Sequence, residues 1–202
     1  MTLDQFRPHL ERALDPFVGV ADRIGLGPDD VSVIAFALAC FAAIAFYLAG
    51  GNPTWYLVGA LLVLGNGWLD VLDGALARRQ GIASTAGDLL DHVLDRYADI
   101  VIVAGLAAGL GAYGLGLAAV TGVLMTSYLG TQAQAVGLDR VYGGLLGRAD
   151  RLALVGAVTA LATFFPGSLG PLTLVGWLLV LFAVVGHLTA LQRFYYALLA
   201  LR

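Results

Sequence analysis

The sequence predicts an all-α, polytopic membrane protein in which an amphipathic helix at the membrane surface precedes six transmembrane helices. Of its 202 residues, 59% are hydrophobic and only 12% are charged, and the mean hydropathy is +0.85. Soluble domains carry about twice that share of charged residues. One cysteine, Cys40, excludes a disulfide scaffold, and a net charge of −3 without a basic patch does not suggest a nucleic-acid partner. We therefore expect residues 1–202 to form one membrane-embedded domain.

Residues 2–24 differ from the rest of the chain because apolar residues recur there at helical spacing between charged ones. The apolar positions are Leu3, Phe6, Leu10, Leu14, Phe17 and Val18. This pattern is typical of a juxtamembrane amphipathic helix that lies on the membrane surface. A soluble N-terminal cap is the alternative.

The rest of the chain, residues 31–200, is expected to form a six-helix membrane bundle. A transmembrane helix needs about 20 mostly apolar residues. Six stretches meet this requirement, at approximately residues 31–50, 55–77, 89–112, 115–137, 149–166 and 171–200. Glycine and proline break the chain clearly at 50–53 and 165–171, and more softly at 111–114.

The charged residues all lie on one side of this predicted bundle. With six spans, the two termini and the second and fourth loops share a side, and these segments with the adjoining helix ends contain all 11 arginines. The three opposite loops contain no charged residue. The positive-inside rule then predicts a multi-pass protein of the cell membrane with both termini and the active site in the cytoplasm.

Four aspartates form the most informative pattern in the chain. Asp70 and Asp73 are three residues apart and Asp91 and Asp95 are four apart, so each pair shares one helix face. The connection between the two helices is short, which predicts antiparallel neighbours whose carboxylates meet. Four such carboxylates repel one another, and a hard divalent cation such as Mg²⁺ or Mn²⁺ relieves that repulsion. A rim of salt bridges to nearby arginines is the alternative.

The aspartates belong to a longer pattern, Asp70-x2-Asp73-Gly74-x2-Ala77-Arg78-x8-Gly87-x3-Asp91-x3-Asp95. It resembles the complete signature of the CDP-alcohol phosphotransferase (CDP-alcohol phosphatidyltransferase) family, and the six predicted spans are similar to that family too. The resemblance covers nearly the whole chain. It implies a membrane enzyme, usually a homodimer, that transfers a phosphoryl-lipid group from a CDP-linked donor to an alcohol and releases CMP.

The resemblance also implies roles for single residues. Asp70 and Asp91 would bridge two ions of Mg²⁺ or Mn²⁺, Asp73 would complete the first site, and Asp95 would help hold the second. Asp95 would also be the catalytic base that deprotonates the acceptor hydroxyl. The positions that match nucleotide contacts of the family are Asp29, Asp30, Val31, Ser32, Gly74, Arg78 and Ser84, with Ser32 in place of the commoner threonine.

Three arginines resemble the acceptor site of one branch of the family. Arg148 and Arg151 are similar to the Arg-x-x-Arg of the enzymes that make phosphatidylinositol phosphate or its archaeal ether-lipid counterpart, and Arg193 matches another basic position. In that branch these arginines help bind the phosphate of inositol phosphate. Gly130 and Gln132 stand where the branch usually has basic residues. Ordinary arginines of the cytoplasmic side are the alternative interpretation.

The predicted function is transfer of a phosphatidyl or archaetidyl group from CDP-diacylglycerol or CDP-archaeol to a phosphorylated polyol, with inositol phosphate as the acceptor. Because basic residues are missing at positions 130 and 132, glycerol 3-phosphate is an alternative acceptor. A divalent-cation transporter and a catalytically inactive membrane scaffold are more remote alternatives. The apolar spans offer a transporter no polar path, and a scaffold would be expected to have lost one of the four aspartates.

Overall fold

The computed structural model describes residues 7–82, 84–138 and 146–201, so the first residues of the expected surface helix, 2–6, lie outside the described part. The described residues form seven helices and one short hairpin. In order they are α1 (Arg7–Arg23), α2 (Pro28–Ala49), α3 (Thr54–Gln80), α4 (Thr85–Gly109), α5 (Tyr113–Ala135), α6 (Arg148–Phe164), β1 (Ser168–Leu169), β2 (Leu172–Thr173) and α7 (Leu174–Ala200). The prediction of an all-α fold is confirmed, and each predicted span overlaps one of α2 to α7, with its ends within four residues of the helix ends.

The hairpin is the main departure from the predicted elements. Ser168 pairs with Thr173 and Leu169 with Leu172, around Gly170, whose φ of 69° lies in the left-handed region that favours glycine. The last helix therefore begins at Leu174, three residues later than predicted, where the Thr173 hydroxyl accepts a hydrogen bond from the Gly176 amide at 3.1 Å.

By length and composition, four helices among the described residues can cross a membrane: α2, α3, α5 and α7. The other two predicted spans, which correspond to α4 and α6, do not meet this criterion, for separate reasons. Helix α4 carries Asp88, Asp91, Asp95 and Arg96 in its first half, and α6 has only 17 residues. The chain is thus a multi-pass membrane protein whose charged residues are concentrated on particular helices.

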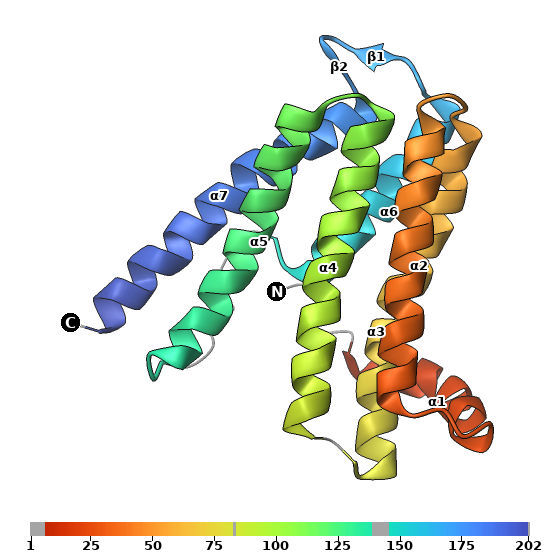
Figure 1. Cartoon of the computed structure of the whole chain (residues 1–202), viewed down its shortest axis with the longest axis vertical. Helices are drawn as coiled ribbons and strands as arrows, with labels where there is room; N and C mark the ends of the chain where they lie inside the picture. Colours follow the sequence, from red (N-terminus) through yellow and green to blue (C-terminus); the bar gives the residue numbers. More distant parts are fainter. Residues whose placement is uncertain (1–6, 83, 139–145, 202) are drawn as a thin grey trace.

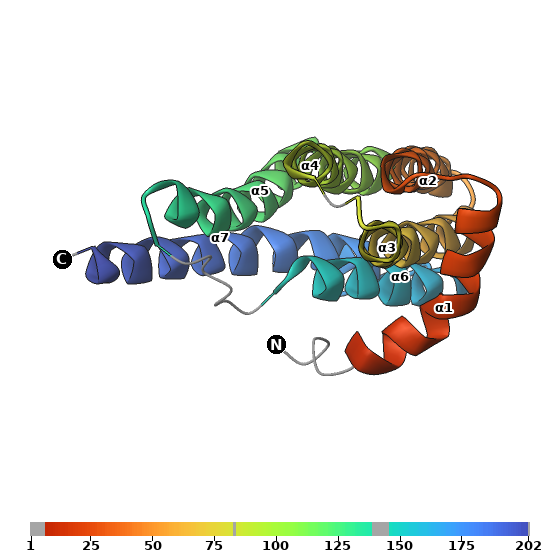
Figure 2. The ribbon, with the colours of Figure 1, turned by 90° about the horizontal axis from the view of Figure 1, so that it is seen from below.

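Helix α2 packs along both α3 and α4, which contact each other little (Figure 1). Helix α6 contacts α3, and α5 lies between α4 and α7. The hairpin lies at one end of the bundle, while α1 and the α3–α4 connection lie at the other. Figure 2 shows this second end, where α1 runs across the bundle beside α2 and α3.

Helix α1 is fixed to the bundle by an apolar cluster and by polar contacts. Leu14, Val18 and Ala21 are buried against three residues of α2 and α3, namely Val31, Leu72 and Leu76. The Gln80 amide donates hydrogen bonds to the Asp22 carboxylate at 3.0 Å and to the Leu26 carbonyl at 3.2 Å. These contacts hold the last turn of α3, and with it the signature, against the start of α2.

Glycine allows α2 and α4 to approach closely. A Cβ atom on Gly105 would lie 2.5 Å from the carbonyl oxygen of Ala43, which is closer than such atoms come in folded proteins. The interface is otherwise lined by small buried residues of α2, including Ala39 and Ala42. Close packing here sets the distance between the N-terminal ends of the two helices.

We expect Gly105→Ala to destabilise the protein, because the new methyl group pushes α2 and α4 apart at a cost of about 1–3 kcal/mol. Thermal unfolding in detergent micelles measures the change. Gly114→Ala is the matched control, because its Cβ meets no described atom within 4 Å and alanine favours helix. Equal melting temperatures for native protein and Gly105→Ala would contradict the close approach.

Candidate metal and phosphate site

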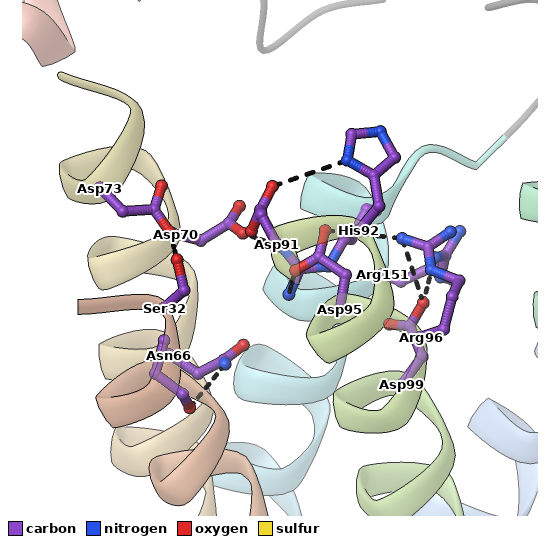
Figure 3. Close-up of polar contacts among 12 residues, drawn as sticks. Ser32, Asn66, Asp70, Asp73, Asp91, His92, Asp95, Arg96, Asp99 and Arg151 are labelled. Carbon is purple, nitrogen blue, oxygen red and sulfur yellow. Dashed lines mark hydrogen bonds and ion pairs between the residues drawn. The ribbon is translucent and has the colours of Figure 1, made fainter. Parts of the chain in front are cut away.

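Helices α3 and α4 bring the signature aspartates together in the middle of the polar end of the bundle. Oxygen atoms of Asp70, Asp91 and Asp95 all lie within 4.8 Å of one another, a spacing at which one cation can contact all three. Asp73 lies beside this group, and its buried carboxylate accepts a hydrogen bond from the Ser32 hydroxyl of α2 at 2.7 Å (Figure 3). The structure therefore gathers three of the four predicted metal ligands into one group and holds the fourth next to it.

Arg148, the first residue of α6, enters this group of carboxylates. Its guanidinium contacts Asp70 at 2.5 Å and Asp95 at 2.6 Å. The Asp150 carboxylate accepts from the Gly147 amide at 2.9 Å, which caps α6 and fixes where its first residue lies. Arg148 was predicted as an acceptor contact, and its ion pairs with two signature aspartates were not expected from the sequence.

A second set of ion pairs lies deeper in the bundle. Arg151 donates to Asp99 at 2.7 Å, and both side chains are buried, with 5% and 4% of their residue surface exposed. Arg96 lies 4.0 Å from Asp99 and 3.6 Å from Asp95, so it joins this pair to the carboxylate group. Asp99 lies outside the signature but shares the helical face of Asp91 and Asp95, from which a structural role beside the site is predicted for it.

Arg193, the third predicted acceptor contact, lies between α5 and α7. Its guanidinium donates to the carbonyl oxygen of Thr126 at 2.6 Å. The hydroxyl of Thr126 in turn donates to the Gly186 carbonyl of α7 at 2.8 Å. The structure thus associates Arg193 with the α5–α7 contact, whereas Arg148 lies at the carboxylates.

A large cavity of about 510 Å³ opens beside the aspartates. It lies between the N-terminal ends of α2 and α4 and the last turns of α3. Six of the seven predicted nucleotide contacts line it: Asp29, Asp30, Ser32, Gly74, Arg78 and Ser84. The seventh, Val31, is buried in the apolar cluster under α1. Two helix N-termini facing one cavity favour a bound anion such as a phosphate, because their free amide groups carry partial positive charge.

Gly87 leaves space open between α2 and α4 at this cavity. A Cβ atom on Gly87 would lie 3.1 Å from Asp29 and 3.3 Å from the Ser84 hydroxyl oxygen. That hydroxyl accepts a hydrogen bond from the Gly87 amide at 3.0 Å and thereby caps the N-terminal end of α4. The signature glycine therefore leaves space between α2 and α4 that a side chain would fill.

A smaller cavity of about 10 Å³ adjoins the large one. Its lining includes all four signature aspartates, Arg148 and Asn66, and it shares Ser32, Asp73 and Asp91 with the large cavity. The carboxylates therefore lie at the inner end of the space that suits a phosphorylated ligand. Because one guanidinium faces four carboxylates there, the residues fit a divalent cation with oxygen ligands.

Comparisons with known proteins agree with this arrangement. The family model described as CDP-alcohol phosphatidyltransferase matches residues 27–190. The chain is 37% identical over 200 residues to archaetidylinositol phosphate synthase of Methanothermobacter thermautotrophicus, covering 96% of this chain and 93% of the relative. It is 33% identical over 198 residues to phosphatidylinositol phosphate synthase of Mycobacteroides abscessus, covering 93% and 84%.

Solved structures of phosphatidylinositol phosphate synthase from Mycobacterium tuberculosis have a similar fold. The structure with CDP-DAG bound gives a TM-score of 0.77 at 26% identity and covers 92% of this chain and 94% of that chain. The structure in complex with manganese and citrate gives a TM-score of 0.78 at 25% identity, with 91% and 88% covered.

The buried pair of Asp99 and Arg151 makes a prediction about stability. Asp99→Leu leaves the Arg151 guanidinium buried without its nearest partner, and we expect the free energy of unfolding to fall by about 3–5 kcal/mol. Chemical denaturation in detergent measures this loss. The double variant Asp99→Leu/Arg151→Met removes both charges and should recover most of it. Equal losses in the single and double variants would show that the two side chains do not depend on each other.

Proposed function

The chain belongs to the CDP-alcohol phosphatidyltransferase family, and on that premise we propose that it transfers a phosphatidyl or archaetidyl group from a CDP-linked lipid to inositol phosphate. CMP is the second product. One observation carries the proposal: the signature aspartates lie at the inner end of a cavity of about 510 Å³ that the predicted nucleotide contacts line. Relatives that match over nearly their full length are named archaetidylinositol phosphate synthase and phosphatidylinositol phosphate synthase, which supports this acceptor.

The large cavity binds the CDP group of the donor. Ser32, Ser84 and the N-terminal ends of α2 and α4 provide hydrogen-bond donors at its wall, and Arg78 provides a guanidinium suited to a phosphate. Asp29, Asp30 and Gly74 complete this wall. The similar solved structure with CDP-DAG bound supports a CDP-lipid as the donor.

Asp70, Asp73, Asp91 and Asp95 hold two divalent cations, Mg²⁺ or Mn²⁺. The similar structure that contains manganese supports a divalent cation in this group. When bound, the cations neutralise the charge of the donor pyrophosphate and favour departure of CMP. The chain itself fixes the carboxylates: Ser32 holds Asp73, and Arg148 holds Asp70 and Asp95.

Asp95 acts as the general base for the transfer. Its carboxylate takes the proton of the acceptor hydroxyl, and the hydroxyl oxygen forms a bond to the phosphorus that carries the lipid. The bond from that phosphorus to the bridging oxygen breaks, and CMP leaves with the bonding electron pair. Arg148 lies 2.6 Å from Asp95, so the arginine can orient this carboxylate and, with Arg151 and Arg193, help bind the acceptor phosphate.

The proposed arrangement in the membrane is that of the whole family. Helices α2 to α7 all cross the bilayer, both termini face the cytoplasm, and two copies of the chain form a homodimer. Helix α1 lies on the cytoplasmic membrane surface, where its exposed apolar residues Phe17 and Val20 enter the lipid. The acceptor then arrives from the cytoplasm while the lipid part of the donor stays in the membrane.

The first test is an assay of CMP release by purified protein with Mg²⁺ and CDP-diacylglycerol or CDP-archaeol. Inositol phosphate, glycerol 3-phosphate, free inositol and serine are supplied in parallel. We expect release only with inositol phosphate. Release with glycerol 3-phosphate alone would replace the proposed acceptor, and failure to bind either CDP-lipid would contradict the proposed reaction.

The second test addresses the general base. Asp95→Asn removes the proton acceptor, so we expect the rate of CMP release to fall by about 10²- to 10⁴-fold while CDP-lipid binding persists. Asp15→Asn, on the exposed side of α1, is the control and should retain the native rate. Normal turnover by Asp95→Asn would reject the assignment of this base.

A further inference from the structure

Asn66 lies on the same face of α3 as the signature aspartates but outside the signature. It precedes Asp70 by four residues and Asp73 by seven, which is the spacing of one helix face. Only 1% of its surface is exposed. It lines the small cavity together with all four signature aspartates and Arg148.

The orientation of the Asn66 amide follows from its one hydrogen bond. The nitrogen Nδ2 donates to the carbonyl oxygen of Ala35 in α2 at 2.9 Å. A carbonyl oxygen can only accept, so the amide nitrogen must face α2 and the side-chain oxygen Oδ1 must face the other way. Figure 3 shows this oxygen on the side of the amide away from the dashed hydrogen bond of the nitrogen.

The Asn66 oxygen is a buried acceptor that finds no hydrogen-bond donor among the residues described, 7–82, 84–138 and 146–201. The other polar residues around the small cavity are the four signature aspartates, which are acceptors too, Arg148, and Ser32, whose hydroxyl donates to Asp73. The guanidinium there belongs to Arg148: its two terminal nitrogens contact Asp70 and Asp95, and its Nε makes no hydrogen bond to the Asn66 oxygen. A buried acceptor without a donor destabilises a fold by about 1–3 kcal/mol. A ligand that donates a hydrogen bond to the Asn66 oxygen would remove this cost.

We propose that Asn66 is a positioning residue of the cation site, whose side-chain oxygen accepts a hydrogen bond from a water molecule bound to the cation. This inference rests on the proposed function, because it takes the signature aspartates as the cation ligands. The small cavity, at about 10 Å³, has room for about one water molecule. Mg²⁺ and Mn²⁺ suit oxygen ligands, and Mg²⁺ usually keeps several of its waters in a protein site.

A purely structural role for Asn66 explains less. Its hydrogen bond to Ala35 ties α3 to α2, but the Ser32–Asp73 hydrogen bond already joins these two helices one to two turns further along. An apolar side chain of the same size would fill the space without burying an unpartnered oxygen. The proposed cation site explains why this position has an amide, whose nitrogen donates to Ala35 while its oxygen faces the small cavity.

The test is Mn²⁺ binding by the purified full chain, followed by electron paramagnetic resonance of the free ion. We expect Asn66→Leu to weaken Mn²⁺ binding about tenfold, the loss that outer partners of metal sites commonly cause. Asn66→Asp keeps an oxygen towards the cavity but loses the hydrogen bond to Ala35, so it should bind Mn²⁺ at least as tightly as the native protein. A structural role predicts instead that both variants lose affinity.

Thr189→Val on α7 is the matched control. The Thr189 hydroxyl is also buried without a partner in the described part of the chain, and it lies outside the lining of the small cavity. This variant should bind Mn²⁺ like the native protein. Native affinity in Asn66→Leu, or equal losses in the Leu and Asp variants, would overturn the inference while leaving the proposed function intact. If the native protein itself binds no Mn²⁺, the proposed cation site fails, and the inference fails with it.

Discussion

The structure depends on the burial of several carboxylates in an otherwise apolar helix bundle. Asp70, Asp73, Asp91 and Asp95 line one small cavity, and each would be unstable there without a compensating group. Ser32 from α2 and Arg148 from α6 supply part of this compensation. Helices that are distant in sequence therefore converge on α3 and α4 at the same level, and the remaining negative charge defines what the site can bind.

Close packing by small residues makes this convergence possible. Gly105 lets α2 and α4 approach until their backbones nearly touch, and the two N-terminal ends then face one cavity beside the aspartates. At the open end, α1 covers the last turns of α3 through an apolar cluster and through Gln80. The walls of the large cavity are thus helix ends held in place by packing elsewhere in the bundle.

The polar interactions extend beyond the residues of the signature. A chain of ion pairs runs from Arg151 through Asp99 and Arg96 to Asp95, and its inner pair, Arg151 and Asp99, is buried. On the other side of the carboxylates, Asn66 presents a buried oxygen to the same small cavity. Under the proposed function, substitutions of Arg96, Asp99 or Asn66 would act on the general base Asp95 and on the cation through these interactions.

The sequence by itself determined the helices and the faces on which the aspartates lie, because hydrophobic runs and spacings of three and four residues are local properties of the chain. Six of the seven nucleotide contacts that it predicts line the large cavity. Only the tertiary structure decided that Val31 packs under α1, that Arg148 pairs with Asp70 and Asp95, and that Arg151 is buried against Asp99. These contacts join residues more than 40 positions apart, or depend on which face of a helix is covered. An arginine near a metal site has the same sequence pattern whether or not it pairs with carboxylates of its own chain, and only the packing of α6 against α3 shows that Arg148 does so.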